Sequence, residues 1–443
     1  MAGHRFAVTR AGEAADPAAS DHATASDPAA ADDAAADGVA ADPGRRRAPE
    51  ALYLHVPFCV SLCPYCDFVV YAGAAARGPR NRVAAFVAAL HAEIDLRADA
   101  IVAAGLPTHP LRSVYLGGGT PSLLPADAVD ALLRHVADRF GIAAGAEVTL
   151  EANPGPDERG DAEAWRRTGI TRLSFGAQSV DAAELRRLGR RHRPADVAAA
   201  VREARAAGFE SVSVDLLYDV PGQTDASWSA SLDAALDLGP DHLSLYALTL
   251  DDPDAEGLTG PTGDHLPTTR GARRWRAGAA AEQGEDRAAR QYRHAVGRLA
   301  RDGWRGYEIS NWARPGHESR HNLAYWERRP YEAAGPGAHA FDGSTRRWNA
   351  ARLDAYIAAL ADGRLPPGGA ETIDPATADA ETTILALRLD TGLPAEAARR
   401  PPLAGSWDWA ASAGLLERTD DGRIALTTTG RLLSNELFAR LLG

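Results

Sequence analysis

The chain has 443 residues, 45% of them hydrophobic, and a formal net charge of -12. This length is sufficient for two or three domains around a large apolar core, and the acidic balance argues against nucleic acid as a partner. The sequence has no apolar leader segment and no run of roughly 18 consecutive apolar residues, which predicts a cytoplasmic protein without stable membrane insertion.

The first 47 residues are predicted to form a disordered tail. Residues 11–47 consist mostly of Ala, Asp, Ser and Pro and offer almost nothing to bury. The folded part is expected to begin at Ala48.

From residue 48 to residue 250, short apolar runs that favour strands alternate with helical patterns. The predicted strands lie at 51–56, 112–117, 147–152, 170–176, 211–220 and 242–250, and the predicted helices at 80–105, 125–140, 196–208 and 225–239. Such alternation is typical of parallel strands joined by crossover helices. The predicted fold class is therefore α/β, either a closed or partly closed barrel or a doubly wound sheet.

The remaining chain is expected to form three further parts. Residues 251–291 are rich in Gly, Pro and Arg and are predicted to be an exposed connection. Residues 292–366 contain a segment dense in Trp, Tyr, His and Asn. Residues 367–443 end in the pattern helix, short hairpin, helix, which resembles a small winged-helix domain without a basic recognition face, so we expect it to pack or bind a partner.

All three cysteines of the chain, Cys59, Cys63 and Cys66, follow the first predicted strand. They are odd in number and too closely spaced for a disulfide framework, which favours a metal or redox role. Three thiolates on a [4Fe-4S] cubane leave one iron without a protein ligand and open to a cofactor. The alternative is a structural zinc site completed by His55, although zinc ligands usually come in two separated pairs.

Other polar or glycine clusters follow the later strands. Gly117 to Ser122 read GGGTPS, and Glu151, Gln178 and Asp215 lie at or near the ends of the next three strands. The carboxyl ends of parallel strands form the ligand-binding face of such folds. A glycine turn would offer backbone N–H groups, and the carboxylates would accept from an ammonium group or ribose hydroxyls. Each feature alone fits a turn, a helix cap or a buried ion pair, but together they predict one site.

From Leu52 to its end, the chain resembles the coproporphyrinogen dehydrogenase branch of the radical S-adenosylmethionine superfamily and, within it, the HemW family of heme chaperones. Matching blocks include YLHVPFCVSLCPYCDF, YLGGGTPSLL, VDLLYDVPGQT and HNLAYW. The resemblance implies a partial six-stranded parallel (β/α) TIM-like barrel with a C-terminal extension. It also implies a [4Fe-4S] cluster on the three cysteines and S-adenosylmethionine contacts from Tyr53, Gly118, Gly119, Thr120, Glu151, Gln178, Arg190, Asp215 and Ala247.

Two features favour the heme chaperones over the dehydrogenases. The dehydrogenases carry a further cysteine two residues after the third one, where this chain has Phe68. The HNxxYW motif is present as His321, Asn322, Tyr325 and Trp326, which implies heme binding with the histidine as iron ligand. Arg314 and Arg320 would pair with the heme propionates. Without the resemblance, the same motif favours a structural role, in which packed aromatic rings close the open side of the barrel.

The resemblance thus implies a cytoplasmic heme chaperone that transfers heme to apo-hemoproteins of the respiratory chain, with a homodimer left open. One alternative is an oxygen-independent coproporphyrinogen III dehydrogenase, and another is a zinc-stabilised barrel that binds a partner protein. After the sixth strand the family usually continues with Glu-Pro-Gly-Thr, but this chain reads DDPDAEG. Contacts from that turn are therefore not carried over.

Overall fold

The computed structural model describes residues 45–250 and 269–442. The predicted tail up to residue 44, and residues 251–268 of the predicted connection, lie outside the described residues. The last residues assigned to the tail differ from the expectation, because they are bound to the folded part. Arg46 pairs with the Asp342 carboxylate at 2.8 Å, and the Arg47 N–H donates to the Asp342 carbonyl at 2.7 Å.

A single sheet contains the six predicted strands, which pair in parallel and in chain order. They are β1 (Ala51–Val56), β4 (Leu111–Gly118), β5 (Ile142–Ala152), β6 (Arg172–Gln178), β7 (Ser211–Tyr218) and β8 (His242–Ala247). A doubly wound sheet would reverse its strand order at a switch point, and this order does not reverse. The prediction of a partial parallel barrel is confirmed.

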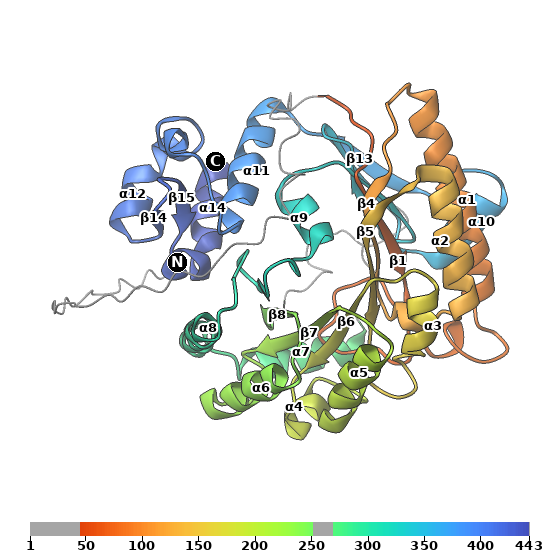
Figure 1. Cartoon of the computed structure of the whole chain (residues 1–443), viewed down its shortest axis with the longest axis horizontal. Coiled ribbons are helices and arrows are strands. Elements are labelled where there is room, and N and C mark those ends of the chain that lie inside the picture. Colours follow the sequence, from red (N-terminus) through yellow and green to blue (C-terminus); the bar gives the residue numbers. More distant parts are fainter. Residues whose placement is uncertain (1–44, 251–268, 443) are drawn as a thin grey trace, which may run out of the picture. The chain divides into compact units, whose positions relative to one another are not determined.

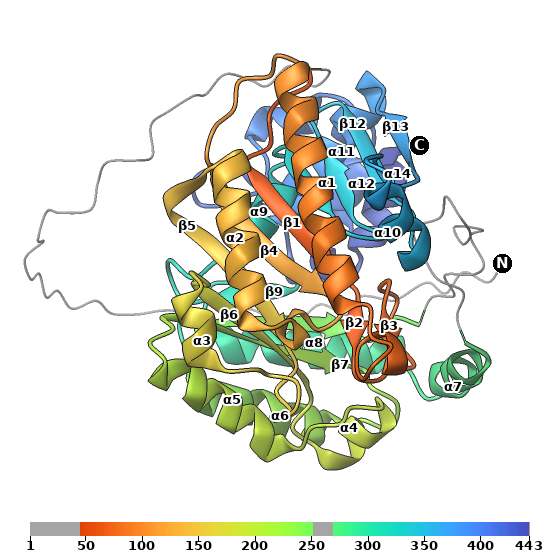
Figure 2. The ribbon, with the colours of Figure 1, turned by 90° about the vertical axis from the view of Figure 1, so that its right-hand side faces the viewer.

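Four predicted helices cover the outer side of the barrel: α1 (Val83–Ala103), α2 (Ala126–Phe140), α5 (Pro194–Ala206) and α6 (Asp225–Asp237). Figures 1 and 2 show α1 and α2 side by side over the strands β1, β4 and β5. The short helices α3 (Ala162–Arg167) and α4 (Ala182–Arg187) were not predicted. Six residues make fewer than two helical turns, which is too short for a clear apolar period.

Residues 311–372 extend the sheet at both edges, so the strand at 368–372 belongs to the sheet and not to the C-terminal part that was predicted to begin at residue 367. The strand β10 (Tyr331–Ala334) pairs in parallel with β1, and the antiparallel strands β11 (His339–Phe341), β12 (Thr345–Asn349) and β13 (Gly368–Thr372) follow it. At the other edge, β9 (Asn311–Ala313) pairs antiparallel with β8. The helix α9 (Arg320–Trp326) contacts β4 from the side of the sheet opposite α1 and α2 (Figure 1), and α10 (Leu353–Ala361) packs on α1.

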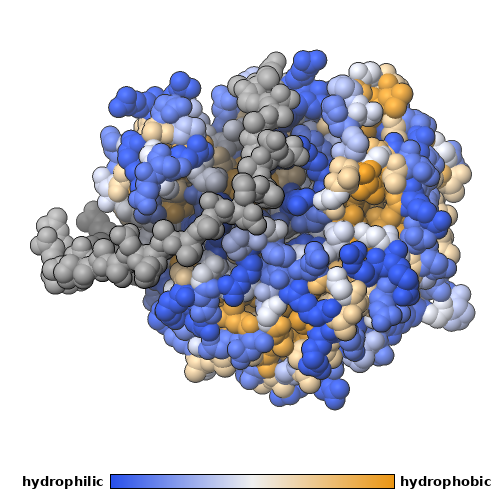
Figure 3. Space-filling view, in the orientation of Figure 1, coloured by the Kyte–Doolittle hydropathy of each residue, from blue (hydrophilic) through white to orange (hydrophobic). Residues whose placement is uncertain are grey.

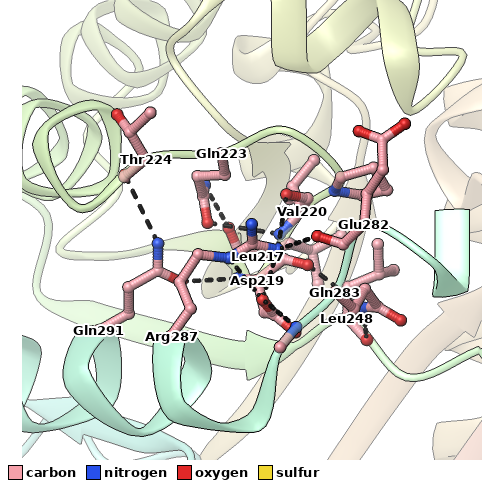
Figure 4. A network of polar contacts seen from close by, with 12 residues as sticks. Leu217, Asp219, Val220, Gln223, Thr224, Leu248, Glu282, Gln283, Arg287 and Gln291 are labelled. Carbon is pink, nitrogen blue, oxygen red and sulfur yellow. Dashed lines mark hydrogen bonds and ion pairs between the residues drawn. The ribbon is translucent and has the colours of Figure 1, made fainter.

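The described part of the predicted exposed connection is mostly exposed, and it is helical and anchored to the barrel at a few buried residues. It comprises α7 (Arg270–Ala280) and the start of α8 (Glu285–Arg301). Figure 4 shows the anchor, in which the Asp219 carboxylate accepts from Arg287 Nε at 2.7 Å and the Asp219 N–H donates to Gln291 Oε1 at 2.8 Å. Gln291 is only 1% exposed. The sequence does not reveal that these anchoring groups have partners on the barrel.

The C-terminal part has its own hydrophobic cluster, which includes Leu387, Leu416, Ile424 and Leu437. It comprises α11 (Pro375–Arg388), α12 (Trp407–Ser412), the strand pair β14 (Leu416–Arg418) and β15 (Ile424–Leu426), α13 (Thr428–Leu432) and α14 (Ser434–Leu442). This order of helix, hairpin and helix is the one that the sequence pattern indicates for residues 407–442.

The face of the molecule in Figure 3 is mainly hydrophilic, with hydrophobic residues gathered in separate patches. Within residues 45–250 and 269–442, no helix has the length and apolar character needed to cross a membrane.

A buried carboxylate joins the barrel to the added strands. Glu93 of α1 is 0% exposed and accepts hydrogen bonds from Asn349 Nδ2, the Tyr356 hydroxyl and the Gly335 N–H, at 2.8, 2.8 and 2.9 Å. Arg97, one helical turn further along, pairs with the same carboxylate at 3.0 Å. A buried charge is tolerated where it is paired and fully hydrogen-bonded, as it is here.

We expect Glu93→Gln to lower the free energy of unfolding by roughly 3 kcal/mol, because it removes the charge that Arg97 and three further donors surround. Chemical denaturation measures this loss. The matched control is Glu163→Gln, which breaks an exposed 3.8 Å pair with Arg167 and should cost less than about 0.5 kcal/mol. Equal losses in the two variants would contradict the stabilising role of the Glu93 carboxylate and its partners.

Candidate functional site

A cleft of about 430 Å³ lies at the carboxyl ends of the parallel strands. Every strand of the barrel, or the loop that follows it, contributes to its lining. The predicted site residues on this cleft are Cys59, Cys63, Cys66, Gly118, Gly119, Thr120, Glu151, Gln178, Arg190, Asp215 and Ala247. Tyr53 is the exception, because its ring lines a second cleft described below. The structure therefore brings most of the predicted residues to one place.

The cysteine loop is held at its far end by His55 of β1. One imidazole nitrogen, Nε2, is hydrogen-bonded to the Val69 carbonyl at 2.8 Å, and the other, Nδ1, to the Tyr53 hydroxyl at 3.0 Å. Burial lowers the pKa of His55 to about 4, so the ring is neutral and donates one bond while accepting the other. With both nitrogens engaged, His55 is not available as the fourth ligand of a zinc site.

A second anchor comes from α7. Arg276, which is 6% exposed, donates from Nε to the Pro64 carbonyl at 3.1 Å and from Nη2 to the Cys66 carbonyl at 3.2 Å. It also pairs with the Asp67 carboxylate. One guanidinium group thus binds three points of the loop that carries the cysteines.

The three cysteines are free thiols. Thr120 donates to Cys59 Sγ at 3.5 Å, and Arg190 donates to Cys63 Sγ at 3.7 Å. Burial raises the pKa of Cys59 to about 11 and that of Cys66 to about 12, so these thiols keep their protons at neutral pH and would release them on binding a metal. In the described parts of the chain, no three His, Cys, Asp or Glu side chains converge on a position for a single metal ion.

The GGGTP sequence predicts a turn that offers its N–H groups to a ligand. In the structure, three of these groups donate to acceptors within the protein instead. Gly118 donates to Glu151 Oε2 at 3.0 Å, Gly119 to the Val56 carbonyl at 2.8 Å, and Thr120 to the Phe58 carbonyl at 2.7 Å. The glycines are needed for packing instead. A Cβ atom on Gly119 would lie 2.7 Å from the Phe58 carbonyl oxygen, closer than such contacts occur.

Two buried carboxylates give the cleft acceptors for a cation. Glu151 accepts from the Tyr115 hydroxyl at 2.7 Å, and its pKa rises to about 7, mainly through burial. Burial also raises the pKa of Asp215, which accepts from the hydroxyls of Ser174 and Ser213 at 3.2 and 3.4 Å. A positively charged ligand would favour the ionised form of both groups.

Arg190 gives the same cleft a donor for an anion. Its Nη2 donates to the Asn153 side chain at 2.5 Å and to the Gly176 carbonyl at 2.6 Å. Its buried Nε has no hydrogen-bond partner in the part of the chain that the structure describes. Carboxylates and an incompletely satisfied guanidinium in one cleft fit a zwitterionic ligand such as an amino acid.

The structure separates the residues predicted to bind heme. Asn322 lines the strand-end cleft, whereas Tyr325 and Trp326 line a second cleft of about 510 Å³. His321 is 1% exposed, with Nδ1 bonded to the Ser113 hydroxyl at 2.9 Å and Nε2 to the Tyr325 hydroxyl at 2.8 Å. Its ring stacks on Tyr115, and burial lowers its pKa to about 3. The ring therefore fills the inside of the barrel.

The arginines predicted to meet heme propionates lie elsewhere. Arg314 donates to the Asp302 carbonyl at 2.6 Å, and Arg320 donates to the Gly145 carbonyl at 2.8 Å. Neither residue belongs to the lining of the two clefts described here.

Sequence reasoning missed several residues of the strand-end cleft: Tyr115, Arg172, Ser174, Ser244 and Tyr246. All five lie within predicted strands. Side chains two apart in a strand share one face, so Ser244 and Tyr246 carried a usable signal through their spacing. No sequence signal pointed to Arg276, because its partner Pro64 lies about two hundred residues away in the chain.

Comparison with known proteins agrees with this geometry. The model of the radical SAM superfamily matches residues 53–235, and the barrel with its cysteine loop is that of a radical SAM protein. The heme chaperone HemW of Mycobacterium tuberculosis is 39% identical over 89% of this chain and 95% of its own length. HemW of Escherichia coli is 36% identical over 66% of this chain and 70% of its own.

Among solved structures, the coproporphyrinogen III oxidase HemN of Escherichia coli matches with a TM-score of 0.70 at 23% identity, covering 90% of both chains. That likeness concerns the fold. The sequence matches to heme chaperones are long and 30% identical or more. The chain therefore belongs to the HemW family of heme chaperones within this superfamily.

The raised pKa of Glu151 predicts a pH effect in the protein without cofactors. Between pH 4.5, the ordinary value, and about 7, the folded carboxyl keeps a proton that the unfolded one loses, so stability falls as pH rises through this window. Glu151→Gln has no carboxyl to titrate, so its free energy of unfolding should not fall through this window. Relative to wild type, the variant should therefore be more stable at pH 8 than at pH 5. Denaturation at both pH values, with Glu163→Gln as control, measures the difference. A pH-independent effect would contradict the raised pKa.

Proposed function

We propose that this protein is a heme chaperone that carries a [4Fe-4S] cluster and S-adenosylmethionine and transfers heme to apo-hemoproteins. The observation that carries the proposal is the match to a curated heme chaperone over 95% of that relative's length. We further propose that it acts in the cytoplasm and that its acceptors belong to the respiratory chain.

The strand-end cleft supports the cofactor part of this proposal. Cys59, Cys63 and Cys66 would hold three irons of a cubane and leave the fourth iron open to the amino acid part of S-adenosylmethionine. Glu151 would accept from its ammonium group and Arg190 would donate to its carboxylate, while Asp215 would accept from the ribose. Gly118, Gly119, Thr120, Gln178 and Ala247 would shape the walls. The cluster and cofactor would permit heme transfer, whereas in the dehydrogenase alternative a reduced cluster would supply one electron to the sulfonium of the cofactor.

The role of His321 as a heme ligand, which the resemblance implied, has little support in this geometry. To reach an iron atom the ring would have to give up its bonds to Ser113 and Tyr325 and leave the interior of the barrel. Such buried polar groups are costly to leave without partners. Tyr53 likewise contacts His55 rather than the cofactor cleft, so its predicted contact with S-adenosylmethionine would need a changed position.

A transfer assay tests the function. The protein reconstituted anaerobically with iron and sulfide, and loaded with hemin, is mixed with a heme-depleted respiratory b-type cytochrome, and the absorbance of the cytochrome is followed. We expect transfer, and we expect no protoporphyrinogen IX from coproporphyrinogen III, S-adenosylmethionine and a reductant. Formation of that product without heme transfer would identify a dehydrogenase and overturn the proposal.

The cluster assignment has its own test. Cys63→Ala should abolish the brown colour of the reconstituted protein, because two cysteines would remain for four irons. A colourless wild-type protein that retains zinc would instead support the zinc-stabilised alternative.

The anchor on α7 predicts a positioning role for Arg276. We expect Arg276→Met to lose its cluster several times faster than wild type under air, because the loop would lack its bonds to Pro64, Cys66 and Asp67. The decay of absorbance near 400 nm measures this rate. Arg274→Met, at an exposed position of the same helix, serves as control and should decay as wild type does. Equal rates in both variants would show that the anchor does not hold the cysteine loop.

A further inference from the structure

Arg172 lies inside the barrel, deep in the strand-end cleft. It is the first residue of β6 and lines this cleft together with Ser174 and Gly176. Residues spaced by two in a strand share one face, so all three point into the barrel. Arg190 reaches the cleft at the Gly176 carbonyl, which is roughly 13 Å further along the strand. Arg172 therefore occupies a position of its own, away from the arginine assigned to the cofactor.

The guanidinium group of Arg172 is buried and incompletely bonded. The residue is only 3% exposed, and its Nε has no hydrogen-bond partner within residues 45–250 and 269–442. Thr149, its direct neighbour on β5, is 0% exposed, and its hydroxyl also lacks a partner in this part of the chain. Buried polar groups are nearly always hydrogen-bonded, so two neighbouring exceptions beside a cleft mark a place where a ligand completes the bonding.

The carboxylates around Arg172 have other donors. Glu147 accepts from the backbone N–H groups of Arg320 and His321 at the start of α9, at 3.1 and 3.2 Å. Asp215 accepts from the serine hydroxyls described above. Burial acts against the charge of Arg172, but these two carboxylates raise its pKa through their charge, so the guanidinium group stays protonated. Its donors are left for an acceptor that comes from outside the protein.

The charges around this position select the chemical class of that acceptor. The planar fork of a guanidinium group matches the two oxygens of a carboxylate. Glu151 and Asp215 line the same cleft, so an anion with two charges would meet repulsion that a single carboxylate meets less. Asn322 of α9 also lines the cleft and offers an amide donor to the same ligand.

We propose that Arg172 binds the carboxylate group of a small ligand other than the cofactor, inside the barrel. This position adjoins Asp215, the residue assigned above to the ribose of S-adenosylmethionine, so the carboxylate would lie on the ribose side of the cleft. The site goes beyond the proposed chaperone function and does not depend on it, because its residues are in place in the protein without cofactors.

Saturation-transfer NMR with sodium acetate as the probe tests this site in the full-length chain free of S-adenosylmethionine. Acetate can also pair with Arg190, so the comparison is made in the Arg190→Met background, with sodium chloride keeping the ionic strength constant. We expect this protein to bind acetate, and the additional change Arg172→Met to weaken binding by roughly 10-fold or more, because a charge-assisted hydrogen-bond pair is lost. The matched control is Arg112→Met in the same background, at an exposed position of β4, which should leave acetate binding unchanged.

A second variant covers the case in which Arg172→Met does not fold, as judged by circular dichroism. Arg172→Lys keeps the charge but loses the planar fork, so it should bind acetate several-fold more weakly than arginine does. Formate should displace acetate, whereas sulfate at the same concentration should not.

Three results would overturn the site. They are absence of acetate binding in Arg190→Met, unchanged binding after the exchange of Arg172 in a folded variant, and equal displacement by sulfate and formate, which would show general anion binding. Failure of the heme-transfer assay would overturn the chaperone function and leave this site standing, because the acetate experiment uses neither heme nor cofactor.

Discussion

The hydrogen bond from His55 to the Val69 carbonyl is the constraint on which both clefts depend. It fixes the end of the cysteine loop to the central strand β1, and two glycines pack closely against the same histidine. A Cβ atom on Gly118 would collide with the His55 ring, and one on Gly335 with its carbonyl oxygen. Burial keeps the ring neutral, so it carries no charge into the core.

Because the loop is fixed in this way, two clefts of different chemistry share one wall. The strand-end cleft contains carboxylates, a guanidinium group and three thiols, whereas the second cleft is aromatic with charges at its edge. Arg276 adds a further restraint from a helix distant in the sequence. The loop therefore separates a polar, ionisable environment from an aromatic one.

Burial at the strand-end cleft opposes the charged forms that binding would need. Burial raises the pKa of Glu151, Asp215, Cys59 and Cys66, so carboxyls and thiols retain protons that a cation or a metal would displace. Ligands that bind the folded state stabilise it by mass action, and here the stabilisation would include relief of this desolvation. The cofactors would thus act on the stability of the barrel as well as on its function.

The six parallel strands, the helices α1, α2, α5 and α6, and the cysteine loop at the first strand end could all be predicted from the sequence. Local periodicity determines such elements, and the carboxyl ends of parallel strands meet wherever a barrel closes. Tertiary structure alone decided the rest. It placed Tyr53 and His321 in hydrogen bonds away from the strand-end cleft, used the GGGTP N–H groups within the protein, and joined Arg276 to the loop. These outcomes depend on contacts between residues far apart in the chain, which no local pattern records.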